Sequence, residues 1–185
     1  MAANLPSYSQ NRIPVGGARL FIGAIGTTPS TDIGALDPDA GVTVTIMREY
    51  GEVRQGMPSL PILSYVTRED IEVEVSGYEM NPELMRYAMG AGVTTASASQ
   101  ETYSLGGDPA VTTCALFVRH EMLAGHTMSI YLWKAEGRSD GMQNVFNMSP
   151  TTFPMKFRAL HASTDWAGTA TNSKGQLFKI VYDKA

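Results

Sequence analysis

Apolar and polar residues alternate along much of the chain with the two-residue period of β-strands. The clearest case is Ile71–Val75, where Glu72 and Glu74 would share one face and the apolar residues the other. Val42–Ile46 alternates valine or isoleucine with threonine in the same way. Further strands are predicted at Arg19–Ile25, Glu101–Leu105, Ala110–His120, Thr127–Ala135, Thr152–His161 and Gln176–Tyr182. This pattern predicts a mainly β fold, a β-sandwich or barrel.

Glycine, proline and small polar residues mark where these strands should end. We expect a turn at Tyr50-Gly51, with Glu52–Arg54 returning, and another at Leu123–His126. Met57–Pro61 should not form a central strand, because proline lacks the ladder donor. The segments with loop chemistry are Gly26–Ala40, Gly90–Ser99 and Ser163–Gly175, the last expected at the surface.

One short helix is predicted after Ile71–Val75. Asn81 suits the N-cap, Pro82 the first helical position, and Glu83 the positive end of the helix dipole. Gly90 supplies a C-terminal stop. So short a helix must dock against the sheet. The apolar positions expected to pack there are Leu84, Tyr87 and Ala88.

The chain length favours one domain, since 185 residues are few for two. Residues 1–17 are polar, contain two prolines and show neither period, so we expect an extended N-terminal arm, with a frayed terminus as the alternative. Residues 18–185 should then form a single β domain with the short helix at its flank.

Composition narrows the classes of function. Charged residues are 17% of the chain, below the roughly 25% of ordinary domains, and the net charge is −4. A mildly acidic protein is a poor candidate for gripping nucleic-acid phosphates, whereas a surface with few charges suits contact with other protein. A single cysteine permits no internal disulfide. No stretch has the length of a signal peptide or membrane span, so we expect an intracellularly made protein without membrane contact.

Candidate chemistry is sparse. His120 and His126 would approach each other across a hairpin, but no metal-ligand motif surrounds them, and half-buried histidines are the expected outcome. Cys114 lies in an apolar strand and should be an inert core residue. The G-x-G at Gly90–Gly92 follows a helix, whereas a phosphate loop precedes one. We therefore predict no enzyme activity, no catalytic or metal residues and no cofactor.

The order of the segments resembles the tail tube (major tail) proteins of tailed bacteriophages. The resemblance is carried by the opening LFIGAIGTTPS, the VTVT strand, and the strand-to-helix segment IEVEVSGYEMNPELMRYAMG. It implies a β-sandwich-like tube domain whose hexameric rings close their inner sheets into one barrel and stack into a hollow tube. The implied location is the virion tail, after assembly in the host cytoplasm. The implied partners are further copies, the tape-measure protein, baseplate and tail terminator, and a sheath where one exists; DNA passes through without specific binding.

Within that resemblance, acidic residues are expected to line the lumen, where they would repel DNA phosphates. The lumen candidates are Glu72, Glu74, Glu49 and Glu52. Arg48, Arg54 and Arg68 lie among them, and their pairing within or between subunits stays open. The arm and the Gly26–Ala40 loop are expected to be flexible and to carry ring-to-ring contacts. The stacking candidates there are Asn11, Arg12, Thr31, Asp32, Asp37 and Asp39.

Three other readings remain. Another ring component of the same machinery, such as a tail terminator, a baseplate hub or a secretion-system tube protein, would share the fold but make a single ring or a different tube. A monomeric small-ligand-binding β-barrel would have an apolar interior cavity. A hydrolase without a recognisable motif is the third.

Overall fold

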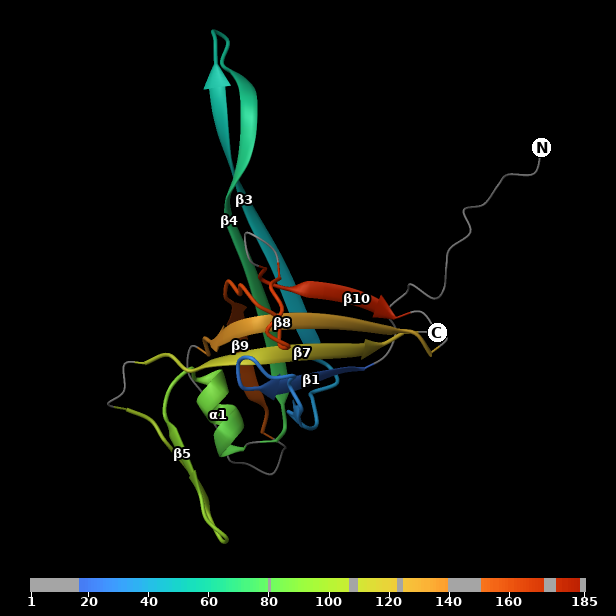
Figure 1. Cartoon of the computed structure of the whole chain (residues 1–185), viewed down its shortest axis with the longest axis vertical. Helices are drawn as coiled ribbons and strands as arrows, with labels where there is room; N and C mark the ends of the chain where they lie inside the picture. The colour runs from blue at the N-terminus through green and yellow to red at the C-terminus, as the bar shows by residue number, and fades with distance from the viewer. Residues whose placement is uncertain are drawn as a thin grey trace, which may run out of the picture.

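The computed structural model describes residues 17–79, 81–106, 110–122, 125–139, 151–171 and 176–183. These residues form a main sheet of eight strands, a separate two-stranded hairpin and one short helix (Figure 1). The predicted mainly β class with a single short helix is confirmed. The proposed arm lies outside the described residues except for Gly17.

The main sheet is antiparallel throughout, with the strand order β2-β1-β7-β8-β9-β4-β3. Its strands are β1 (Ala18–Gly23), β2 (Thr31–Asp32), β3 (Val42–Gln55), β4 (Leu60–Gly77), β7 (Thr113–Glu121), β8 (Thr127–Gly137), β9 (Phe153–Ala159) and β10 (Lys179–Asp183). Along one edge, strand β8 pairs with two different strands. Its residues 127–131 pair with β10, and its residues 135–137 pair with β9.

One face of this sheet carries the hydrophobic core. The alternation in Ile71–Val75 holds, because the apolar residues of that segment are buried and the two glutamates are not. Phe153, Met155 and Phe157 of β9 lie in the same cluster, each at most 2% exposed. The core is thus filled by side chains of alternate strand positions, as expected for a sheet covered on that face.

Helix α1 (Pro82–Ala88) begins and docks as predicted. The side chain of Asn81 accepts hydrogen bonds from the backbone N–H groups of Glu83 (2.8 Å) and Leu84 (3.3 Å). The predicted packing residues Leu84, Tyr87 and Ala88 are all buried. The helix end lies so close to β8 that a Cβ at Gly137 would be 2.0 Å from the Tyr87 carbonyl oxygen. This close approach requires glycine there.

The predicted turn at Tyr50-Gly51 is wrong. Strand β3 continues through it to Gln55, and the turn is formed by residues 56–59 before β4 begins at Leu60. Gly51 lies under the Tyr65 ring of the opposite strand, where a Cβ would be 2.7 Å from Tyr65 Cζ. Glycine is therefore placed here by a cross-strand contact rather than by a turn. Met57–Pro61 is not a central strand, as predicted.

Three loops contain more structure than the sequence indicates. Residues 90–99 include strand β5 (Val93–Ala96), which pairs with β6 (Glu101–Ser104) in the second hairpin. The 26–40 loop is tied to the body by β2, by the buried Ile33 and by a bridge between Leu36 and Gly77.

The third loop lies at the surface, as predicted, and none of its described residues is buried. Trp166 packs on an aromatic cluster, with ring centroids 5.0 Å from both Tyr131 and Trp133 and 5.9 Å from Phe117. The loop thereby covers part of the sheet face that lies opposite the core.

Candidate assembly surface

The β3–β4 hairpin extends far beyond the rest of the molecule (Figure 1). Strand β9 pairs with β4 only from Glu72 to Gly77, so the outward part of β4 has β3 as its single strand partner in the described chain. Strand β3 ends the sheet, which leaves its other edge open among the described strands. Both edges therefore present backbone donors and acceptors to another chain.

The hairpin is covered with exposed apolar side chains. Each of the following is at least 41% exposed: Ile46, Met47, Tyr50, Val53, Met57, Leu60, Ile62, Leu63, Tyr65 and Val66. A two-stranded ribbon in water is marginally stable at best, and contiguous apolar surface of this extent marks an interaction site. The structure thus presents an exposed apolar element with the properties of an interaction surface.

Charge divides the hairpin into two zones. The nine residues from Gln55 to Leu63, which form the end of β3, the turn and the outer end of β4, include no charged side chain. We call this segment the uncharged tip. The strand opposite this tip carries one ion pair, Glu52 with Arg54. The root carries more charges, among them Arg48, Glu49, Glu69 and Asp70.

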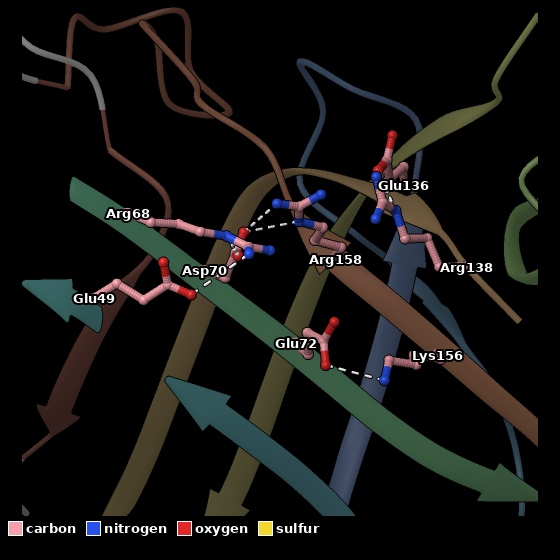
Figure 2. Close-up of polar contacts among 8 residues, drawn as sticks. All are labelled: Glu49, Arg68, Asp70, Glu72, Glu136, Arg138, Lys156 and Arg158. Carbon is pink, nitrogen blue, oxygen red and sulfur yellow. Dashed lines mark hydrogen bonds and ion pairs between the residues drawn. The ribbon is translucent and has the colours of Figure 1, made fainter. Parts of the chain in front are cut away.

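An ion-pair network holds the root to the body of the sheet (Figure 2). Asp70 is only 5% exposed and accepts from Arg158 of β9, whose Nε lies 2.9 Å from Asp70 Oδ1. Arg68 pairs with the same carboxylate and, at 3.6 Å, with Glu49. The Arg158 hydrogen bond is the main cause that lowers the pKa of Asp70, against the opposing effect of burial. The network ties β3, β4 and β9 together where the hairpin leaves the sheet.

Lys156 of β9 extends this network along the same face. Its Nζ lies 3.0 Å from a carboxylate oxygen of Glu72 and 3.0 Å from one of Glu74, and these two acids raise its pKa, Glu74 more than Glu72. Beyond it, Arg138 pairs with Glu136 at 2.6 Å. The face formed by the network residues holds five carboxylates and four cations: Glu49, Asp70, Glu72, Glu74, Glu136, Arg68, Arg138, Lys156 and Arg158. It is nearly neutral rather than acidic.

The four lumen candidates do not share one face. Glu72 and Glu74 lie two residues apart on β4, and Glu49 lies opposite Arg68 on the same side of the ribbon. Glu52 is three residues from Glu49 in β3. The nearby register shift leaves Thr67 of β4 unpaired, so it does not interrupt the alternation of side chains along β3. Alternation therefore places Glu52 on the opposite face. The structure does not bring it together with the other three.

The arginines near these acids pair within the chain. Arg48 binds Glu69, and Arg54 Nη2 lies 2.9 Å from a carboxylate oxygen of Glu52. These side chains are about half exposed, so such pairs contribute little to stability. Their main effect is to neutralise the root locally.

The described stacking candidates lie in the loop between β1 and β3. Thr31 is exposed at the start of β2, and Asp32 pairs with Arg19 at 3.2 Å. Asp37 accepts from the backbone N–H of Asp39 at 3.0 Å, and its own N–H binds Ser76. These contacts order the loop on the body instead of leaving it free. Asn11 and Arg12 lie outside the described residues.

The remaining candidates behave as packing residues. Cys114 is fully buried, which raises the pKa of its thiol to about 12. His120 and His126 are half-buried, as expected. Across the described ranges, no three His, Cys, Asp or Glu side chains gather as metal ligands. No helix in this part of the chain is long and apolar enough to cross a membrane.

Sequence reasoning missed the two features that define this surface. Asp70 and Arg158 are 88 residues apart, and no local period links them. The uncharged tip, however, could have been found from the absence of charged residues between Gln55 and Leu63. No protein-family model matches the chain, and no curated protein matches it.

Proposed function

We propose that this protein is the structural subunit of a bacteriophage tail tube, whose copies form hexameric rings that stack into a hollow conduit for genome delivery. The observation that supports this most is the projecting β3–β4 hairpin, with exposed apolar side chains and two edges that no other described strand covers. In a monomer such an element exposes apolar surface and unpaired backbone groups to water. In a repeating assembly, neighbouring copies can cover the apolar side chains and pair with the strand edges. The low charge of the chain and its resemblance to tail tube proteins point the same way.

Under this proposal, the sheet and the flanking helix α1 form a β-sandwich-like tube domain. Inner sheets of neighbouring subunits close into one barrel, which removes free strand edges from the ring. The loop carrying Thr31, Asp32, Asp37 and Asp39 takes part in stacking, together with Asn11 and Arg12 of the N-terminal arm.

The nearly neutral face around Lys156 is the proposed channel wall. Glu49, Glu72 and Glu74 lie on it, and their pairing with Arg68 and Lys156 leaves few cations free to hold phosphate. DNA then slides past without specific binding. Glu52 has no part in this wall, because it faces the other way. The tape-measure protein fills the channel before ejection, and the baseplate, tail terminator and any sheath are the other partners.

Negative-stain electron microscopy of the purified protein over a concentration series tests the proposal. Long tubes with a stain-filled channel are the expected result. Single rings that never stack would identify a terminator or hub instead. A protein that stays monomeric at every concentration, and is stabilised by lipophilic ligands, would replace the proposal with a ligand-binding barrel.

The structure offers the ligand-binding and hydrolase alternatives little support. Phe153 and Phe157 occupy the core between sheet and helix, where a barrel would hold its ligand. The most buried carboxylate, Asp70, is committed to two arginines. We propose no enzymatic role.

A further inference from the structure

An open groove of about 910 Å³ lies beside the root of the hairpin. One wall is the outward part of β4, including Val66, Thr67 and Ile71, and the other includes Leu177 and Phe178 just before β10. Among the described strands, none pairs with this edge of β4, because β9 reaches β4 only from Glu72 onward. The groove thus offers both apolar side chains and backbone hydrogen-bonding groups.

The charges around the groove are already paired. Arg48 binds Glu69, and Asp70 binds Arg68 and Arg158. An occupant therefore needs no charge of its own, and a charged one would have to break an existing pair or remain unpaired. The uncharged tip, with Met57, Leu60 and Ile62 exposed, has the matching chemistry.

The tip of a given molecule does not reach its own groove. Val66 lies at the groove, and the strand from there back to Leu60 spans six residues, or about 20 Å at 3.3 Å per residue. The hairpin also points away from the body (Figure 1). Tip and groove are thus different surfaces at opposite ends of the hairpin.

We infer that the uncharged tip of each copy docks in the β4–β10 groove of the next copy. This inference deepens the proposed function and rests on it, because it names the contact by which the subunits join. A contact between two different surfaces is heterologous, so it propagates into rings or open filaments, whereas a self-complementary contact stops at a dimer. A second copy is favoured over a membrane because the groove is matched to the tip on the same chain.

The test uses variants that remove one half of the contact each. Leu60→Asp places a charge on the tip, at a side chain that is 60% exposed. Met47→Asp places one in the groove, at a side chain that is 41% exposed, and Thr67→Trp fills the groove without a charge. Val93→Asp on β5, with 57% exposure, is the matched control away from both. Circular dichroism checks that all four are folded.

Each single variant should raise the concentration needed for assembly at least about tenfold, while Val93→Asp assembles like the wild type. An equimolar mixture of Leu60→Asp and Met47→Asp should form one-to-one dimers in sedimentation velocity. The intact tip of the second variant then occupies the intact groove of the first, and both remaining surfaces are blocked. The mixture of Leu60→Asp with Thr67→Trp should do the same.

Three results would overturn the inference. One is a mixture that stays monomeric while the wild type assembles, which indicates tip-to-tip contact. Another is normal assembly of Leu60→Asp. The third is flotation of the wild type with phosphatidylcholine–phosphatidylglycerol vesicles that Leu60→Asp abolishes, which assigns the tip to a membrane. Wild-type tubes accompany the first two results, so the proposed function survives them; a wild type that never assembles removes both.

Discussion

Shortening the β3–β4 hairpin separates its role in assembly from its role in folding. We replace residues 51–65 by Asn-Gly, so that Tyr50 and Val66, which already lie opposite each other, flank a two-residue turn. Asn-Gly suits the type I′ turn that matches the twist of such a hairpin. The core and the ion pairs of Asp70 remain untouched.

The effect on stability follows from what is removed. None of residues 51–65 is buried, and five cross-strand pairs are lost, worth about 0.2–1 kcal/mol each. Closing a two-residue connection costs about 2 kcal/mol less chain entropy than closing the original one, because each halving of the length lowers this cost by about 0.6 kcal/mol. The free energy of unfolding therefore changes by between a gain of about 1 kcal/mol and a loss of about 3 kcal/mol. At about 2–4 °C per kcal/mol, Tm falls by no more than about 12 °C.

Two assays read the outcome on the same samples. Differential scanning calorimetry at low concentration measures the unfolding temperature, and sedimentation velocity with electron microscopy measures assembly. We expect a folded monomer that builds no tubes at any concentration at which the wild type does. Phe157→Ala is the matched contrast, since this core residue is fully buried and its loss costs about 3–5 kcal/mol.

Either of two results would refute this reasoning. Tubes of wild-type diameter from the shortened chain would show that the exposed hairpin is not the assembly element. Loss of the folded state would show that the hairpin belongs to the folding unit, against the burial seen here.

Three further predictions concern the body of the protein. Because burial raises the pKa of Cys114 to about 12, a thiol reagent should leave the native protein unmodified and label one thiol per chain in denaturant. The pKa of Asp70 is lowered below its ordinary value of 3.8 in the folded state. Its contribution to stability is therefore complete above pH 3.8 and is lost as pH falls from there through the lower pKa of the folded state. In thermal unfolding, Asp70→Asn should be less stable than wild type at neutral pH and should lose less stability on acidification below about pH 4. Asn81→Ala removes the cap of α1 and should cost about 1 kcal/mol in denaturant unfolding, whereas Asn81→Asp, which keeps an acceptor, should cost much less.

The sequence predicts those parts of the fold in which one face is buried. Ile71–Val75 alternates because the core covers one side of β4 and the ion pairs occupy the other. The helix could be predicted equally well, because Asn81, Pro82 and Gly90 set its two ends through local interactions.

The outward hairpin was not predicted, because neither of its faces is buried by the part of the chain that the structure describes. Leu60, Ile62, Leu63 and Tyr65 follow no two-residue period, and Gly51 imitates a turn although it only makes room for the Tyr65 ring. The ion-pair network at Asp70 could not be predicted from the sequence for another reason. Its partner Arg158 is brought close by the register of β4 with β9, which no local pattern encodes.

Cryo-electron microscopy of the assembled particles is the most direct test of the central claim. The account predicts sixfold rings around an open channel, with every β3–β4 hairpin covered by neighbouring copies. Particles whose hairpins project freely into solvent, or that enclose no channel, would contradict it.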